Sequence, residues 1–243
     1  MKANDLLDLI GEIDDSIIEG VSNKSKLGKP KWVKITTLAA CLCLSITGAF
    51  SIIKNYSDNK PTIKNYNSTE LSKKLPIIHN EAQFVVNVND PKEVVGWGDY
   101  VFVAKVEDEL RTEYSNVRTN EKGKSSARPY TFYKIKVIEN LKGNLKLNES
   151  IEIFKHGGVS YDGKSISLFE GDNLLEVGKY YILIAASGED GRLGQGVPNS
   201  SIELNINNDD ELSNSDVYKA YKDYVQNEIT FDRKRFRSIY DNS

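Results

Sequence analysis

The sequence Lys179-Tyr-Tyr-Ile-Leu-Ile-Ala-Ala186 is the most continuously apolar short stretch in the C-terminal part of this chain. It has no charge after Lys179, and the turn-forming pair Val177-Gly178 precedes it. A run of this length that is rich in aromatic and β-branched residues predicts a strand buried on both faces. Such a strand belongs near the centre of a sheet, so this stretch is the point from which the fold is predicted.

Stretches with a period of two lie on both sides of this central strand. The clearest is Tyr130-Thr-Phe-Tyr-Lys-Ile-Lys-Val-Ile138, which is followed by a turn at Lys142-Gly143-Asn144. Six or seven short strands separated by Gly, Asn and Asp turns predict a mainly β domain, either a small antiparallel barrel or a sandwich. The other predicted strands cover residues 84–88, 100–106, 150–155, 165–169 and 201–206.

Two helices are expected beside these strands. Asp90-Pro91 can start a short helix through Val95, because proline suits the first helical position. Residues 213–216 can cap a second helix that ends at Asn227. The expected C-terminal domain is therefore a β domain at 81–207, followed by a helix and tail at 208–243. The tail, with Arg233-Lys234-Arg235 and Arg237, is expected to be a solvated end rather than a binding patch.

Residues 35–53, ITTLAACLCLSITGAFSII, form a continuous uncharged apolar run. At about 1.5 Å per residue a helix of this length reaches roughly 28 Å, close to the hydrocarbon thickness of a bilayer. The run therefore predicts a transmembrane helix between Ile35 and Ile53. A polar stretch at 54–80, with two prolines and no sustained period, is expected to be a linker.

The charges flanking the run predict its orientation. Five lysines and no acid lie within residues 21–34, whereas 54–243 hold 26 Lys and Arg against 29 Asp and Glu. Because positively charged flanks stay in the cytoplasm, residues 1–34 should lie inside and the β domain outside the cell membrane. Trp32 stands where an aromatic residue anchors a helix at the interface with the lipid bilayer.

Two alternatives to a retained span remain open. A cleaved signal peptide would have a shorter apolar region nearer the N-terminus. The sequence Leu38-Ala39-Ala40-Cys41 also matches a lipobox, in which Cys41 would be lipidated and everything before it removed. Only residues 35–40 separate Lys34 from this cysteine, however, and the apolar run continues well beyond it. A retained helix is therefore the favoured interpretation.

The first twenty residues predict a helix with one apolar stripe. Its apolar residues recur at spacings of four, three and four, and its acidic residues follow the same spacing on the opposite side. A helix of about 15 residues is marginal alone in water, so the stripe needs a cover. A protein groove suits an acidic amphipathic helix better than an anionic membrane does. The expected contact residues for a cytoplasmic protein partner are Leu6, Ile10, Ile13 and Ile17.

Two resemblances extend these expectations. The string from Asp5 to Glu19, followed by lysines, Trp32 and Leu38-Ala-Ala-Cys-Leu-Cys-Leu44, resembles the N-terminal module of single-pass membrane proteins of Gram-positive bacteria. Some of those are thought to be transmembrane anti-sigma factors, which implies a sigma factor as the cytoplasmic partner. The chain lacks the His-x-x-x-Cys-x-x-Cys zinc pattern of one large class of anti-sigma domains.

The second resemblance concerns the β domain. Gly98–Val106, the pattern Tyr130-x-Phe-Tyr-x-Ile-x-Val-Ile-Glu-Asn-Leu-Lys-Gly143, and Gly178–Leu183 are similar to a domain of secreted bacterial lipoproteins. That domain looks like an OB-type barrel, so the resemblance implies an OB-like fold over roughly residues 90–205. It implies no catalytic residues.

No catalytic, cofactor-binding or metal site is expected. The two histidines, His79 and His156, lie far apart in sequence, and both cysteines belong to the apolar run. His156-Gly157-Gly158 lacks an accompanying Gly-x-Ser-x-Gly and predicts a glycine turn. The net charge of −3 excludes a globally basic nucleic-acid binder. Tyr130, Phe132 and Tyr133 are expected to be partly core rather than a face that stacks bases.

The favoured function is a non-enzymatic single-pass membrane protein whose external β domain binds or senses an unknown ligand. Its internal helix would contact a partner such as a sigma factor. An envelope-anchored structural or adhesion protein, or a lipoprotein without a signalling role, is the first alternative. A surface hydrolase is the second, and it would need a cleft with convergent polar groups.

Overall fold

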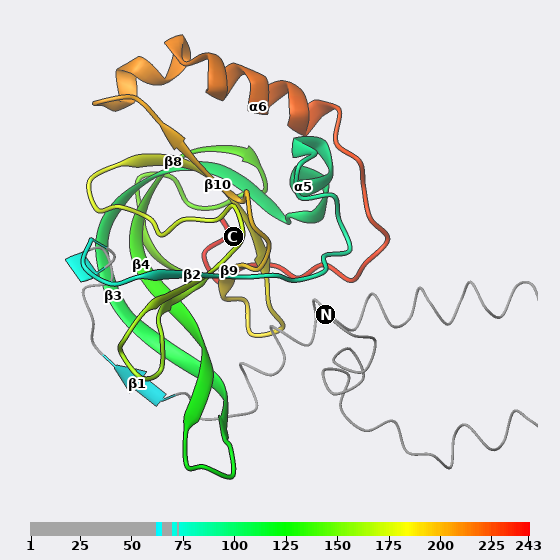
Figure 1. Cartoon of the computed structure of the whole chain (residues 1–243). Coiled ribbons are helices and arrows are strands. Elements are labelled where there is room, and N and C mark those ends of the chain that lie inside the picture. Colours follow the sequence, from blue (N-terminus) through cyan, green and yellow to red (C-terminus); the bar gives the residue numbers. More distant parts are fainter. Residues whose placement is uncertain (1–61, 65–69, 72) are drawn as a thin grey trace, which may run out of the picture. The chain divides into compact units, whose positions relative to one another are not determined.

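The computed structural model describes residues 62–64, 70, 71 and 73–243. The predicted helix within 1–34 and the predicted span at 35–53 lie outside these residues. No helix in the described ranges combines the length and the apolarity that crossing a bilayer requires. The C-terminal domain is mainly β, with helix α6 along one side of the sheet (Figure 1).

The helices and strands follow one another along the chain as in Figure 1. Their bounds are β1 Thr62–Lys64, β2 Ile77–Asn80, α5 Pro91–Trp97, β3 Tyr100–Thr119, β4 Ser125–Lys142, β5 Ser150–His156, β6 Gly158–Val159, β7 Ile166–Phe169, β8 Tyr180–Ser187, β9 Leu193–Gln195, β10 Ser201–Leu204, the 3-10 helix η1 Asp209–Asn214 and α6 Asp216–Gln226.

Five strands of the larger sheet form a closed cycle of pairings that begins and ends at β3. Strands β3, β4, β5, β9 and β8 are hydrogen-bonded in that order, and β8 also pairs with the first part of β3. β5 and β9 run parallel, whereas the other pairs in this cycle are antiparallel. β1 and β10 are added at the sides of β3 and β8. A smaller sheet contains β2, β7 and β6 in that order. The prediction of a mainly β domain is confirmed.

The stretch from which the fold was predicted forms β8. This strand pairs with β3 on one edge and with β9 and β10 on the other. Tyr181 and Leu183 face one apolar cluster, and Ile182 and Ile184 face another. Burial on both faces explains why the strand carries no polar alternation, and each buried aliphatic side chain contributes roughly 2 kcal/mol.

β3 and β4 are much longer than the sequence predicts. β3 has 20 residues and β4 has 18, and their register shifts at several bulges. A bulge bends its strand and increases the local twist, so long strands can join two differently oriented parts of a sheet. β8 pairs only with Tyr100–Lys105 of β3, and β5 pairs only with Thr131–Lys136 of β4. The outer parts of β3 and β4 therefore extend beyond this cycle as an arm.

The core has two main clusters, one on each face of the larger sheet. The first includes Phe102, Tyr133, Ile135 and Leu183, all buried. The second lies under α5 and α6, which contribute Val94, Val95 and Tyr218. α5 begins as predicted, because the Asp90 side chain accepts a hydrogen bond from the Lys92 backbone N–H and Pro91 follows it.

The predicted strand at residues 84–88 is wrong, since this segment has no strand pairing. Phe84, Val86 and Val88 pack in the second core cluster, and the Phe84 ring also meets the Phe169 ring edge-on with centroids 5.1 Å apart. Side chains satisfy part of its backbone: the Asn87 N–H donates to Glu93 Oε2 at 2.8 Å. Burial of an irregular segment thus produced the alternation that resembled a strand.

Part of the expected linker at 54–80 is also structured. Thr62–Lys64 pairs antiparallel with Thr112–Tyr114 of β3. Ile77–Asn80 pairs in parallel with β7, although all four residues are exposed. β2 joins β7 through its backbone while its side chains stay exposed, so no buried face marked this pairing in the sequence.

Candidate functional site

A pocket of about 490 Å³ lies between the two sheets. β2 and β7 form one wall, and β8 and β10 form the opposite wall. This volume falls within the range of small-molecule sites, which typically combine an apolar lining with a few polar groups. The apolar lining residues are Ile77, Ile166, Leu168, Leu174, Leu175 and Tyr181, and the polar ones are Lys73, Asn173, Glu176, Ser201 and Glu203.

Beside this pocket lies a buried ion pair. Lys155 Nζ is 2.8 and 2.9 Å from the two carboxylate oxygens of Asp172, and the side chains are 1% and 5% exposed. The same Nζ donates to Ser201 Oγ at 3.3 Å. Ser201 lines the pocket, so it joins the pocket wall to the ion pair.

The hydrogen-bond directions show what this arrangement can do chemically. Ser201 donates its proton to Gln195 Oε1 at 3.0 Å and accepts one from the lysine. Lys155 Nζ donates to both Asp172 oxygens and to Ser201, so in this arrangement it acts as a donor to the serine and not as an acceptor of its proton. The arrangement fixes Ser201 as a hydrogen-bonding group of the pocket and does not activate it as a nucleophile.

The rim of the pocket carries a small ionic network. Lys179 Nζ lies 2.9 Å from both Glu176 Oε1 and Glu203 Oε1. The hydrogen bonds that Lys179 donates to these two carboxylates raise its pKa above the ordinary value. The rim is solvent-exposed, so this network shapes the opening more than it stabilises the domain.

The two histidines occupy different environments. His156 is buried and stacks on Phe169, with ring centroids 4.0 Å apart and planes 9° from parallel. Burial, helped by the charges of Arg128 and Lys155, lowers the pKa of His156 to about 3, so the ring is neutral at physiological pH. His79 is exposed in β2. Within the described residues no three His, Cys, Asp or Glu side chains come together as metal ligands.

The sequence predicts a glycine turn after His156, but Gly157 instead forms an isolated parallel bridge with Tyr130, and Gly158 begins β6. Their φ angles of 109° and 143° are conformations that favour glycine. A Cβ at Gly158 would stand 2.4 Å from Thr131 Oγ1, which itself donates to the Gly157 carbonyl at 2.7 Å. The glycines therefore permit close backbone approach between β4 and the junction of β5 with β6.

Tyr130, Phe132 and Tyr133 are all buried and so do not form an open stacking face. Tyr133 belongs to the first core cluster, and its hydroxyl accepts a hydrogen bond from the Leu175 N–H. Tyr130 and Phe132 project from the other face of β4 and pack with Phe154. The sequence-based expectation that these aromatics are core residues agrees with this burial.

An arginine lies over this aromatic cluster. The Arg111 guanidinium stands 4.1 Å from the centre of the Phe132 ring and bonds both oxygens of Glu152, at 2.7 and 2.9 Å. Its Nε also lies 2.6 Å from Glu113 Oε1. Burial raises the pKa of Glu113 to about 7, and the charge of Glu152 acts in the same direction. No local pattern in the sequence indicates this cluster, because its members are brought together from three strands, β3, β4 and β5.

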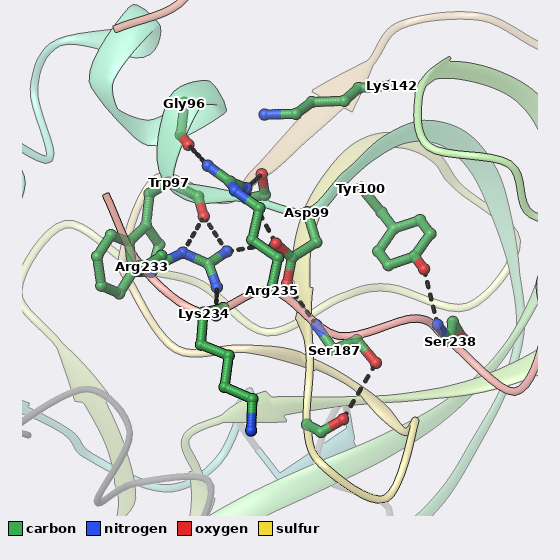
Figure 2. Close-up of polar contacts among 12 residues, drawn as sticks. Gly96, Trp97, Asp99, Tyr100, Lys142, Ser187, Arg233, Lys234, Arg235 and Ser238 are labelled. Atoms are coloured by element: carbon green, nitrogen blue, oxygen red, sulfur yellow. Dashed lines mark hydrogen bonds and ion pairs between the residues drawn. The ribbon is translucent and has the colours of Figure 1, made fainter. Parts of the chain in front are cut away.

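The C-terminal tail is held against α5, so the expectation of a solvated end is wrong. Figure 2 shows Arg233 and Arg235 converging on Asp99, while Lys234 between them points away. Arg233 and Arg235 lie 2.6 and 2.9 Å from Asp99 Oδ1. Asp99 Oδ2 accepts from the Ser187 N–H at 3.0 Å, which connects the tail to the end of β8.

The same arginines cap the C-terminal end of α5. Arg233 donates to the Trp97 carbonyl and stacks over the Trp97 ring at 4.9 Å. Arg235 donates to the carbonyls of Gly96 and Gly98, at 2.7 and 2.8 Å. Cations suit the negative end of a helix dipole, so these contacts satisfy carbonyls that lack partners within α5. We call this group of contacts the tail clamp.

An open pocket of about 420 Å³ lies beside the tail clamp. Its charged groups are already paired, because Lys142 bonds Glu228 and the Val95 carbonyl, and Arg237 lies 3.3 Å from Asp241. The Tyr100 hydroxyl donates to Asp241, and burial raises the pKa of Tyr100 to about 12. These contacts fasten the tail, and Asp241 Oδ1 is the one buried side-chain atom lining this pocket that has no hydrogen-bond partner among the described residues.

The predicted functional residues lie outside the described part of the chain. These are the partner-binding residues Leu6, Ile10, Ile13 and Ile17, the anchor residues Trp32, Ile35 and Ile53, and the alternative lipidation site Cys41. No protein-family model matches this chain, and a search of curated proteins finds no match. The pocket between the sheets, which sequence reasoning missed, is the candidate site that the described residues offer.

Proposed function

We propose that this chain is a non-enzymatic single-pass membrane protein whose external domain is an OB-like barrel that binds a small ligand. The observation that carries the proposal is the cycle of pairings β3-β4-β5-β9-β8-β3 with its parallel β5–β9 contact. A sheet whose last strand pairs with its first has the connectivity of a barrel, and OB-type barrels serve as binding modules. The first core cluster then fills the barrel interior.

The pocket between the sheets is the proposed ligand site. Its aliphatic walls suit an apolar ligand body, and Ser201 and Glu203 supply hydrogen-bonding groups. Binding is favoured over hydrolysis because the hydrogen bonds of Ser201 leave it without a base. The membrane anchor at 35–53 and the orientation rest on the apolar run and its lysines.

A probe experiment tests the pocket. The uncharged fluorophore N-phenyl-1-naphthylamine should bind the full chain in detergent micelles, with a signal above that of micelles alone. Asn173→Trp places a bulky ring at the pocket wall and should abolish this excess signal. Val217→Trp, at an exposed position on α6, is the matched control and should leave it unchanged. Equal signals from all three proteins would refute the pocket.

The internal helix is proposed to contact a cytoplasmic partner such as a sigma factor. Ile10→Asp combined with Ile13→Asp places two charges in the apolar stripe and should abolish co-purification of that partner. Asp8→Asn combined with Asp15→Asn, on the acidic side, is the control that should retain it. If no protein co-purifies with the unsubstituted chain, the regulatory part of the proposal fails and an envelope-anchored role without signalling replaces it.

A further inference from the structure

The arm formed by the outer parts of β3 and β4 ends in a turn that is held by side-chain hydrogen bonds. The Asn120 side chain accepts from the backbone N–H groups of Lys122 and Lys124, at 3.1 and 2.9 Å. Gly123 has a φ of 76°, and the hydroxyls of Thr119 and Ser125 are 2.8 Å apart across the two strands. The turn therefore presents its flanking side chains from a defined position.

The tip of this arm is basic. Arg118, Lys122, Lys124 and Arg128 are exposed, and none of them forms an ion pair with another described residue. Glu121 is the one acid between Asn116 and Arg128.

The hydrogen bond from the Ser160 hydroxyl is the main cause that lowers the pKa of Asp162 in a neighbouring loop, and the charges of Lys124 and Lys164 lower it further. The acids near the tip thus offset only part of its charge. Val117 is 45% exposed beside these cations, and basic side chains next to an apolar one suit a membrane interface.

The register of β1 shows from which side the chain reaches the arm. Thr62 pairs with Tyr114 and Lys64 with Thr112, and β1 is antiparallel to β3. Thr62, the end nearer the predicted span, therefore lies on the tip side of the pairing. Residues 54–61 connect Ile53 to Thr62, and eight residues reach at most about 30 Å. In the proposed topology this linker keeps Thr62, and with it the tip side of the β1–β3 pairing, within about 30 Å of the end of the span.

From these observations we infer that the arm tip docks onto anionic lipid headgroups of the membrane that anchors the chain. The inference rests on the proposed topology and adds a second, electrostatic contact to the apolar span. Each cation near an anionic surface is worth about 1 kcal/mol, which corresponds to roughly a fivefold change in the binding constant for the bilayer surface. Four such cations would orient the domain relative to the bilayer.

The test uses the full chain in nanodiscs, with Cys41→Ser, Cys43→Ser and a bimane-labelled Ser126→Cys at the exposed tip. The discs contain phosphatidylcholine with or without phosphatidylglycerol, and a lipid with a spin-labelled headgroup serves as quencher. We expect strong quenching only with phosphatidylglycerol, and less quenching as ionic strength rises. Arg118→Gln, Lys122→Gln, Lys124→Gln and Arg128→Gln together should reduce it to the level in phosphatidylcholine.

A matched control removes exposed cations on the opposite side of the domain, where α6 lies in Figure 1. Lys219→Gln combined with Lys222→Gln should leave the quenching at Ser126→Cys unchanged. Equal quenching with and without phosphatidylglycerol would overturn the inference. So would binding of the tip to soluble polyphosphate in preference to these bilayers.

Protease digestion of the same discs separates this inference from the proposed function. Discs are open to protease on both faces, so only the span itself is expected to be protected. If the span is protected but the tip is not quenched, the inference fails and the proposed topology stands. If residues 35–53 are digested, the span is not inserted, and both fail.

Discussion

Two buried ionic centres hold different parts of this domain, and they are built in different ways. The Lys155–Asp172 pair joins β5 to the loop after β7, and both side chains are almost fully buried. In the tail clamp one acid, Asp99, serves two arginines, of which Arg233 is 4% and Arg235 34% exposed. The first centre is closed to solvent, whereas the second is graded from buried to exposed.

This difference shows how burial sets the energetic role of a charge. A closed one-to-one pair is costly to break from one side but can be replaced whole by apolar groups. In the tail clamp the helix carbonyls share the arginines, so loss of one contact leaves others in place. We therefore expect a single substitution in the Lys155–Asp172 pair to remove nearly all of its contribution to the free energy of unfolding. Successive substitutions in the tail clamp should each remove a part of its contribution.

The largest effect is expected at the closed pair. Lys155→Met leaves the Asp172 carboxylate buried without its counter-ion and should lower the free energy of unfolding by about 3–5 kcal/mol. Lys155→Met combined with Asp172→Leu should recover most of that loss, because no buried charge remains. Urea denaturation measures both, with the exposed Lys164→Met as control. A double variant no more stable than Lys155→Met would contradict the claim that the unpaired buried charge causes the loss.

A smaller effect is expected at the shared acid of the tail clamp. Asp99→Asn keeps the shape but removes the charge that neutralises Arg233, so we expect a loss of about 2–3 kcal/mol. The tail should also become sensitive to limited proteolysis. The exposed neighbour Asp232→Asn should stay within about 0.5 kcal/mol of the unsubstituted chain. An intact, protease-resistant tail in Asp99→Asn would show that the apolar contacts alone fasten it.

The stability of the domain in acid depends on His156, which follows Lys155 of the closed pair in β5. The folded-state pKa of His156, about 3, is below its unfolded value of 6.5. The neutral ring therefore contributes stability that is present above pH 6.5 and is lost as the pH falls toward 3. Between pH 7 and 5 this group should remove about 2 kcal/mol. His156→Phe should lack this decrease in urea titrations, and an unchanged decrease would contradict the assignment.

The smallest effect is expected at the exposed side of the tail clamp. Arg235→Gln removes a partly solvated ion pair and should cost no more than about 1 kcal/mol. Arg233→Gln, which empties a buried position, should cost more in the same urea experiment. If the two losses were equal, exposure would not explain the graded response.

The sequence predicted the strands whose side chains alternate and the central strand that is buried on both faces. It misassigned Phe84–Val88, because an irregular segment packed on a core can show the same alternation as a strand. The tail clamp could not be predicted, since Arg233 and Asp99 are 134 residues apart and each is ordinary in its local sequence. The pocket between the sheets likewise depends on how β2 and β7 lie against β8 and β10, which no local pattern encodes.

The central claim is that this domain lies outside a membrane crossed once by residues 35–53. The most direct test places one epitope after Ala3 and another after Ser243, and treats intact cells with protease. The account predicts that the C-terminal epitope is digested while the N-terminal one survives until the cells are opened. Digestion of the N-terminal epitope on intact cells would contradict the orientation. Its loss from the mature chain would instead indicate cleavage before a lipidated Cys41.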